Sequence, residues 1–325
     1  MAVILTILLF GSIVVMHELG HFITAKINKI KINAFSVGMG PAIFSWKRGE
    51  TKYFLRAFPI GGYVSIDDEK FEETSIQKRI AVILAGSLIN IVSGFLVISI
   101  IVLIQGQFVS TKVKSVNSEQ NRIQVGDYIT SVNNHHVLES NDLIFELSKI
   151  DDNIPINLTV LRNNEIIDLH DVGYFKHDGN TSYRTLGISL DVEQVNFSNF
   201  FITSFNKSVF VTKLVWVSFC DLVTGKISID NISGPIGFTK SVSDAKSQGV
   251  LSIISLFPLL SINIGIFNLL PFPALDGGRF IFLLFELIFR RKIKKSFQTY
   301  INAFGILILI FLFIVVAIKD ICSFF

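Results

Sequence analysis

The sequence predicts a polytopic α-helical membrane protein with about four transmembrane helices, a membrane-associated β-hairpin and one small extracytoplasmic α+β domain. Half of the 325 residues are hydrophobic and only 17% are charged, whereas soluble domains carry about 25% charged residues. Four apolar stretches approach or exceed the roughly 20 residues that cross a bilayer as a helix. Between them, residues 106–193 have the polarity and the length of an independent domain.

The four apolar stretches are predicted to be transmembrane helices at about 2–25, 80–104, 250–275 and 301–318. The first stretch has no Lys or Arg before Lys26, whereas a cleaved signal peptide begins with a basic segment, so we expect a retained helix. The third stretch is interrupted by five polar or helix-breaking residues: Pro258, Asn263, Asn268, Pro271 and Pro273. A broken helix at membrane depth is tolerated only beside protein or a water-filled cavity, which indicates a functional site there.

Basic residues cluster in two loops, 26–79 and 286–299. The positive-inside rule places both loops in the cytoplasm, so the two termini and residues 106–193 are predicted to lie outside. Residues 197–224 are apolar but are broken by Lys207, Lys213 and Asp221. A fifth span here would move the second basic loop outside, so we interpret this segment as interfacial amphipathic helices on the outer surface. A fifth transmembrane helix is the alternative.

The chain therefore divides into four predicted parts. Residues 1–105 form an N-terminal membrane region with two spans, and its cytoplasmic-side loop 26–79 contains the β-hairpin. Residues 106–193 form the extracytoplasmic domain. The rest of the chain comprises the interfacial helices at 194–249 and a C-terminal membrane region at 250–325, with the broken span, a basic loop and the last span.

The β-hairpin is predicted from two alternating, Gly-punctuated stretches, Asn33–Trp46 and Tyr53–Ile66, which are joined by the polar turn Lys47–Glu50. The pair Gly61–Gly62 follows Pro59 and marks a sharp turn or bulge in the second strand. We expect this small sheet to reach toward the membrane.

Charge and cysteine content exclude two other classes of protein. The net charge is only +3, so nucleic acid is not an expected partner, and the lipid bilayer is. The two cysteines, Cys220 and Cys322, form no C-x-x-C pair, so we expect neither a disulfide framework nor a cysteine-ligated metal.

The first apolar stretch contains His17-Glu18-Leu-Gly-His21, which is an H-E-x-x-H motif. Positions i and i+4 of a helix share one face, so His17 and His21 can both bind one Zn²⁺. Glu18 lies beside them, where it can accept a proton from water activated by the metal. A His-Glu-His cluster within an apolar span is costly unless something compensates it, which favours a metal centre over a metal-free polar cluster.

Catalytic zinc needs a third protein ligand, and Asp276 is the candidate. It is the only carboxylate between Asp244 and Glu286, and it follows the broken stretch. Two preceding prolines, Pro271 and Pro273, indicate unwound backbone with unpaired carbonyl groups. Asp276 can also cap the helix that follows it, and the two roles can coexist.

Asn268 begins the same segment, and two interpretations of it stay open. It can position the substrate backbone or polarise its carbonyl group, or it can serve as a hydrogen-bond partner for the broken helix.

Together these motifs resemble the site-2 protease family of intramembrane zinc metalloproteases. The resemblance rests on H-E-x-x-H in the first span and on Asn268-x-x-Pro-x-Pro-x-Leu-Asp276-Gly-Gly near the end. Phe35–Pro41, Pro59–Val64 and Ser233–Gly237 are similar to further segments of its bacterial, RseP/RasP-type branch. This resemblance covers nearly the whole chain. It implies a multi-pass enzyme of the bacterial cytoplasmic membrane, with the catalytic site toward the cytoplasmic side and Asp276 completing the zinc site.

The resemblance also implies that the substrates are single-span transmembrane proteins or peptides, such as anti-sigma factors and remnant signal peptides. It implies that the hairpin at 34–66 binds the unwound substrate as an added strand. Asn90 matches a family position near the active site, or else makes an interhelical hydrogen bond. The candidate substrate-binding residues are therefore Asn268, Pro271, Pro273, Gly61, Gly62 and Asn90.

Residues 108–192 resemble a single PDZ domain, through Gly126–Asn133 and through the strand Ile156–Arg162 with the turn Asn163–Glu165 after it. The segment lacks a clear Gly-Leu-Gly-Phe-like carboxylate loop. We therefore expect a size filter over the active site at least as much as capture of peptide C-termini.

The expected activity is that of a zinc metalloendopeptidase in which Glu18 assists the attack of zinc-bound water on the peptide bond. The alternatives are a metal or ion transporter, which also places His and Asp within the membrane, and an inactive scaffold that carries a PDZ domain. The small number of spans disfavours the transporter, and the intact Glu18 disfavours the scaffold. No individual substrate and no oligomeric state are predicted.

Overall fold

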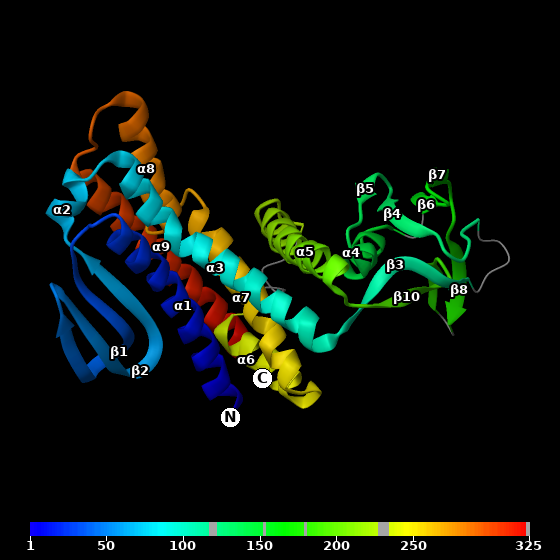
Figure 1. The fold of residues 1–325 in the computed structure, drawn as a ribbon, viewed down its shortest axis with the longest axis horizontal. Coiled ribbons are helices and arrows are strands. Elements are labelled where there is room, and N and C mark those ends of the chain that lie inside the picture. Colours follow the sequence, from blue (N-terminus) through cyan, green and yellow to red (C-terminus); the bar gives the residue numbers. More distant parts are fainter. Residues whose placement is uncertain (117–121, 152–153, 179–180, 227–233, 323–325) are drawn as a thin grey trace. The chain divides into compact units, whose positions relative to one another are not determined.

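The protein folds into two compact units, Met1–Val97 with Thr212–Phe325, and Ile98–Val211 (Figure 1). The computed structural model describes residues 1–116, 122–151, 154–178, 181–226 and 234–322. The first unit holds the membrane-type helices and the candidate site, and the second unit is built on a central sheet.

Four helices in the described part of the chain are long and apolar enough to cross a membrane. They are α1 (Ala2–Ile27), α3 (Ile76–Gln105), α7 (Val250–Leu269) and α9 (Lys295–Cys322). These helices confirm the four predicted spans. The remaining long helix of the described residues, α5 (Phe197–Val223), is not one of the four. The shorter helices beside them are α2 (Asp68–Glu73), α6 (Pro235–Gln248) and α8 (Asp276–Phe289).

The backbone is unwound at Pro271 and Pro273, as predicted, whereas Pro258, Asn263 and Asn268 do not interrupt the third apolar stretch. α7 continues through Pro258 and Asn263 as one helix, and the backbone leaves helical geometry only at 270–275, before α8. A proline leaves the carbonyl four residues before it without its helical partner, and membrane helices tolerate this where neighbouring helices pack closely. α3 passes close at this point, because a Cβ added at Gly94 would lie 3.4 Å from the Pro258 carbonyl oxygen.

The predicted hairpin is confirmed as two long antiparallel strands, β1 (Ile32–Arg48) and β2 (Thr51–Ile66), beside α1 (Figure 1). Each strand bends in the middle, so the hairpin folds back on itself as four short segments. The order of these segments across the sheet is 62–66, 32–37, 51–56 and 42–48. Residues 62–66 are therefore an edge segment of the sheet.

The two bends depend on glycines with positive φ, which other residues adopt only with strain. Gly40 has a φ of 84° and Gly61 a φ of 75°, which confirms the bend predicted at Gly61–Gly62. Arg56 stabilises the folded hairpin by hydrogen bonds from its three guanidinium nitrogens. They donate to Ser36 Oγ at 2.9 Å, to the Gly40 carbonyl at 2.6 Å and to Tyr63 Oη at 2.9 Å.

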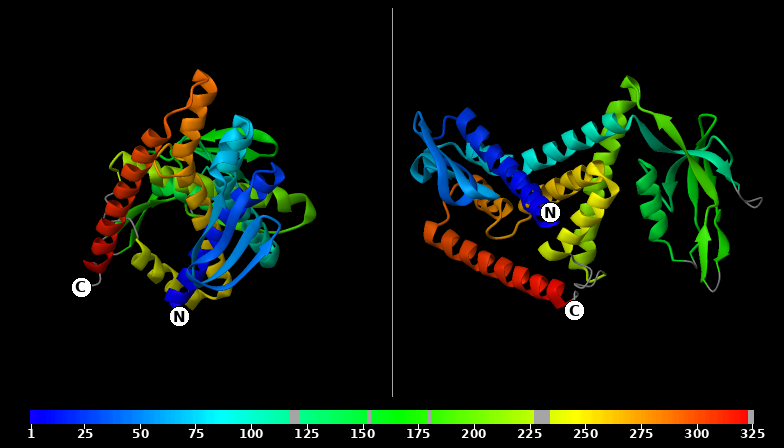
Figure 2. Two further views of the ribbon diagram at one scale, coloured as in Figure 1. Left: turned by 90° about the vertical axis from the view of Figure 1, so that its left-hand side faces the viewer. Right: turned by 90° about the horizontal axis from the view of Figure 1, so that it is seen from below.

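α6 packs on α1, α7 and α9, and it lies beside the start of α1 and the end of α9 (Figure 2). The buried carboxylate of Asp320 in α9 accepts hydrogen bonds from the amides of Gly234 (3.2 Å) and Gly237 (2.8 Å) at the beginning of α6. An anion at a helix N-terminus is favourable, because the amides there lack helical partners. Ser233, the first residue of the motif singled out in this region, lies outside the described residues.

The second unit contains an antiparallel sheet in the order β10-β3-β4-β6-β7, with β5 paired to β4. Its strands are β3 (Gln107–Val116), β4 (Tyr128–Val132), β5 (His135–His136), β6 (Leu158–Arg162), β7 (Glu165–Leu169) and β10 (Ile188–Gln194). A separate hairpin consists of β8 (Tyr174–Asp178) and β9 (Thr181–Thr185). One helix, α4 (Ser140–Ser148), contributes Leu143 to a buried core that also contains Ile129 and Val160.

The strand predicted at Ile156–Arg162 and the turn predicted at Asn163–Glu165 are confirmed, as β6 and the connection from β6 to β7. Asn163 and Asn164 have φ values of 51° and 66°, as a two-residue hairpin turn requires. The pairing of β3 with β10, which joins Gln107 to Gln194, was not predicted. Its partners lie at opposite ends of the unit's sequence, so no local pattern indicates it.

A buried ion pair joins α3 to α8 within the first unit. Arg79 Nη2 donates to Glu286 Oε1 at 2.7 Å, and Nη1 donates to Oε2 at 3.1 Å. The two side chains are only 6% and 13% exposed. The geometry is bidentate, so each charge compensates the other where little water can.

We expect Arg79→Met to destabilise the purified protein by about 3 kcal/mol or more, because it leaves the Glu286 carboxylate buried and unpaired. Adding Glu286→Leu should restore most of the lost stability. Denaturant unfolding of the wild type and the two variants in one detergent measures both effects. A double variant no more stable than Arg79→Met would contradict this prediction.

In the second unit, Asp127 is fully buried and is held by three hydrogen bonds. Arg162 donates from Nε to Oδ1 at 2.7 Å and from Nη2 to Oδ2 at 2.8 Å, and the amide of Gln124 donates to Oδ2 at 2.9 Å. Burial alone would raise the pKa of Asp127, but these hydrogen bonds outweigh it and hold the pKa below its ordinary value.

The lowered pKa of Asp127 predicts acid sensitivity of the second unit. Because the folded-state pKa lies below the unfolded-state value, the stabilisation is complete above the ordinary Asp pKa of about 3.9 and is lost as the pH falls through the folded-state pKa. Asp127→Asn should reduce stability at neutral pH and flatten this acid-dependent loss. Hydrogen exchange of the β4 and β6 amides across pH checks both effects. A variant with the wild-type pH dependence would show that another group is responsible.

Candidate metal centre

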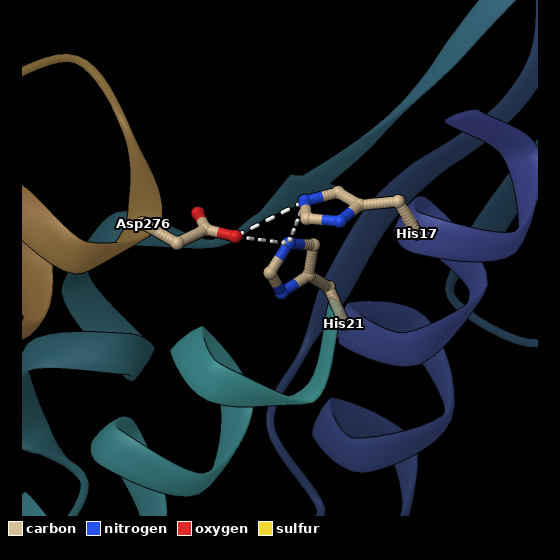
Figure 3. A group of neighbouring side chains, drawn as sticks. All are labelled: His17, His21 and Asp276. Atoms are coloured by element: carbon tan, nitrogen blue, oxygen red, sulfur yellow. Dashed lines mark hydrogen bonds and ion pairs between the residues drawn. The ribbon is translucent and has the colours of Figure 1, made fainter. Parts of the chain in front are cut away.

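His17, Glu18 and His21 lie on α1, an apolar helix without Lys or Arg before Lys26. His17 and His21 are one turn apart, and their rings meet edge to face with centroids 4.8 Å apart. Figure 3 shows both rings pointing toward Asp276, which begins α8. The structure therefore brings together the three residues that the sequence predicted as ligands.

Glycines bring α3 against the histidine face of α1. A Cβ added at Gly20 would collide with the Ala85 carbonyl, and one added at Gly86 would lie 2.5 Å from His21 Nε2 and 2.8 Å from His17 Cε1. Close packing therefore leaves room for both rings only because these positions carry no side chain.

The loop 270–275 presents Asp276 to the histidines. A Cβ at Gly277 would collide with the carbonyls of Leu269 and Leu270, so the loop can fold tightly over the first turn of α8 only with glycine there. α9 supports the loop from another side, because Asn302 Oδ1 accepts a hydrogen bond from the Ala274 amide at 3.3 Å.

The three candidate ligand atoms converge closely. Asp276 Oδ2 lies 3.0 Å from His17 Nε2 and 3.2 Å from His21 Nε2, and the two Nε2 atoms are 3.2 Å apart. Ligand atoms of a tetrahedral zinc site with bonds of about 2.0–2.1 Å are separated by about 3.3 Å. The spacing of the donor atoms therefore fits a zinc ion.

The tautomer of His21 gives an independent test of this fit. Its Nδ1 lies 2.8 Å from the Val82 carbonyl oxygen, which only accepts, so Nδ1 carries the proton. Nε2 of the neutral ring then directs a lone pair at the Asp276 carboxylate. Two acceptors this close repel each other unless a cation or an added proton lies between them.

A cavity of about 1060 Å³ opens beside the three side chains and is lined by polar groups from several elements. Glu18 lines it, and its Oε2 accepts a hydrogen bond from the Val64 amide at 2.9 Å. Tyr63 to Ile66, the edge segment of the hairpin, also face this cavity. The candidate base thus lies between the candidate ligands and a strand edge.

The candidate substrate-binding residues occupy different places. Asn268 lines the cavity, while Pro271 and Pro273 belong to the loop that supports Asp276. Gly61 and Gly62 lie where β2 crosses α1, and a Cβ at Gly62 would be 2.6 Å from the Ser36 carbonyl oxygen. Asn90 is fully buried behind the ring of His17, with its Nδ2 3.5 Å from His17 Nδ1.

Some residues that shape the site were not predicted. The Val82 carbonyl could not be, because backbone groups leave no trace in sequence. Gly86 was not predicted either, although a glycine on an apolar helix is a weak signal for close helix packing. Asn302 gave a clearer signal, as a lone amide near the start of the last span.

Comparison with known proteins gives the class of this chain. A model of Peptidase family M50 matches residues 5–312. A predicted zinc metalloprotease of Clostridium acetobutylicum is 32% identical, over 98% of this chain and 97% of the relative. Another, of Fusobacterium nucleatum, is 32% identical over the full length of both chains. The regulator of sigma-W protease RasP of Bacillus subtilis is 25% identical over 98% of each chain.

The chain belongs to peptidase family M50, the site-2 proteases. It is a zinc-dependent metalloprotease bound to a bacterial membrane, as the predicted resemblance implied.

We expect Asp276→Ala to lower the zinc content of the purified protein, because it removes one of three converging donor atoms. Metal analysis of protein purified without chelators measures this directly. Asp244→Ala, a change at the preceding carboxylate of the chain, is the control and should leave the zinc content at the wild-type value. Full zinc occupancy in Asp276→Ala would remove Asp276 from the ligand set.

Proposed function

We propose that this protease is an endopeptidase that cleaves single-span transmembrane proteins or peptides, with His17, His21 and Asp276 as zinc ligands and Glu18 as general base and acid. The observation that carries the proposal is the convergence of three ligand atoms within 3.2 Å of one another beside a large cavity. Glu18 reaches the same cavity from the same helix.

When bound, zinc makes a water molecule more acidic and stabilises negative charge on the oxygen of the attacked carbonyl. Glu18 accepts the proton of the attacking water and then delivers it to the leaving amine nitrogen. The hydrogen bond from the Val64 amide holds the Glu18 carboxylate at the cavity wall. Asn268, also in this wall, is placed to hydrogen-bond the substrate backbone.

The substrate segment binds in extended form along residues 62–66. A helical peptide bond is shielded by its own backbone, so the segment must unwind before attack. Tyr63 to Ile66 line the cavity and form an edge of the folded hairpin, which supports pairing with an added strand. Gly61 serves this binding through its positive φ, which allows the bend of β2, and Gly62 by letting the neighbouring strand approach at the Ser36 carbonyl.

The second unit is the single PDZ domain of the proposed architecture and lies outside the cell, as do both termini. Support comes from a groove of about 320 Å³ between α4 and the start of β10, lined by Leu143, Leu186 and Ile188 among others. β10 is an edge strand, and Gly187 beside it has a φ of 60°. This Leu-Gly-Ile segment is a candidate carboxylate loop, which favours binding of a peptide end over a pure size filter.

The proposed substrates are anti-sigma factors and remnant signal peptides. The name of the Bacillus subtilis relative, a regulator of sigma-W protease, supports the first class. Membership of a peptidase family favours proteolysis over the transporter and the inactive scaffold.

Glu18→Gln should abolish cleavage of a model single-span substrate, with a loss of at least about 100-fold, because the amide cannot accept the proton. Zinc content should stay at the wild-type value, since Glu18 is not one of the three converging donors. Co-expression with tagged substrates measures cleavage, and metal analysis of the purified variant separately measures its zinc content. Retained cleavage would remove Glu18 from its proposed role.

A further inference from the structure

Asn90 contacts a candidate ligand from the side that faces away from the substrate space. Its side chain is fully buried, and within the described chain it is not part of the wall of the site cavity. It lies against Nδ1 of His17, whereas Nε2 of the same ring faces Asp276. A residue in this place acts on the ring of His17 and does not touch substrate.

Asn90 is held firmly by its surroundings. Its backbone carbonyl accepts hydrogen bonds from Ser93 Oγ at 2.9 Å and from Ser261 Oγ of α7 at 2.8 Å. α7 packs directly on it, because a Cβ added at Gly265 would lie 3.3 Å from the Asn90 Cβ. The backbone and the Cβ of Asn90 are therefore held in place by contacts within α3 and with α7.

The role of His17 as a candidate ligand determines which kind of group must lie beside its Nδ1. A ring that binds a metal through Nε2 carries its proton on Nδ1 and donates it to an acceptor. For His21 that acceptor is the Val82 carbonyl. For His17 the group at Nδ1 is the amide of Asn90, whose Oδ1 has no hydrogen-bond partner among the described residues. A half-turn of the amide exchanges groups of nearly equal size and brings Oδ1 to Nδ1.

We propose that Asn90 is a positioning residue: its side-chain carbonyl accepts the Nδ1 proton of His17, and so fixes the tautomer and orientation in which Nε2 faces the zinc ion. The proposal rests on the proposed function of His17 as a ligand. It assigns to Asn90 a role in metal binding in place of the substrate contact expected from sequence.

The test compares zinc affinity in full-length protein purified in detergent, by competition with a chromogenic chelator. Asn90→Leu has similar size but no acceptor, and it should weaken zinc binding by about 10- to 100-fold. Asn90→Asp keeps an oxygen at the same place and should bind zinc at least as tightly as the wild type. Wild-type affinity in Asn90→Leu, or equal loss in both variants, would overturn the proposal.

Ser87→Ala is the matched control. Ser87 lies one turn before Asn90 on α3 and is equally buried, and its Oγ has no hydrogen-bond partner in the described structure. Its removal should leave zinc affinity unchanged. A loss equal to that of Asn90→Leu would show that general packing of α3, and not the amide, supports the metal.

NMR of protein with isotope-labelled histidine nitrogens shows which ring nitrogen carries the proton. A change in packing alone would not alter this tautomer. In zinc-free protein, wild type and Asn90→Asp should both show the His17 proton on Nδ1, where only the residue at position 90 can select it, and this comparison decides the question even if Asn90→Leu does not fold. A proton on Nε2 of His17 in either protein would overturn the proposal. Failure of the proposed zinc site is distinguishable, because His17→Ala would then bind zinc like the wild type.

Discussion

Close contact between helices at glycines is the constraint on which the metal centre depends. In lipid, helices are not driven together by the hydrophobic effect, so close packing and polar contacts have to hold them. Gly20 and Gly86 allow α3 to touch the histidine face of α1, and Gly277 allows the 270–275 loop to fold over α8. Larger residues at these points would collide with their neighbours and push apart the elements that carry the three candidate ligand atoms.

Two buried charges of the first unit are each compensated by a partner from another element. Arg79 of α3 meets Glu286 of α8, and Asp320 of α9 meets the first amides of α6. These contacts join segments that are distant in sequence but adjacent in the bundle. They fix which helices are neighbours where apolar surfaces alone would specify little.

Much of this arrangement could be predicted from the sequence, because it is written in local patterns. Apolar length predicted four helices, alternation predicted both strands of the hairpin, and H-E-x-x-H with Asp276 predicted the group that converges. The folding of the hairpin into four segments could not be predicted, since it depends on which halves pair across the bends. The Val82 carbonyl and the neighbour of His17 are likewise products of packing. The unwinding at Pro271 and Pro273 was predicted correctly, but the interruption expected at Pro258 does not occur, because α7 continues through this proline.

The glycines of α1 also have a mechanical consequence. Gly11 and Gly20 are nine residues apart, which places them on opposite sides of the helix. The first touches the carbonyl of Pro59 in β2 and the second that of Ala85 in α3, with no side chain between. α1 is thus in close backbone contact on two sides. A side chain at either position would push β2 or α3 away from the helix that carries both candidate histidines.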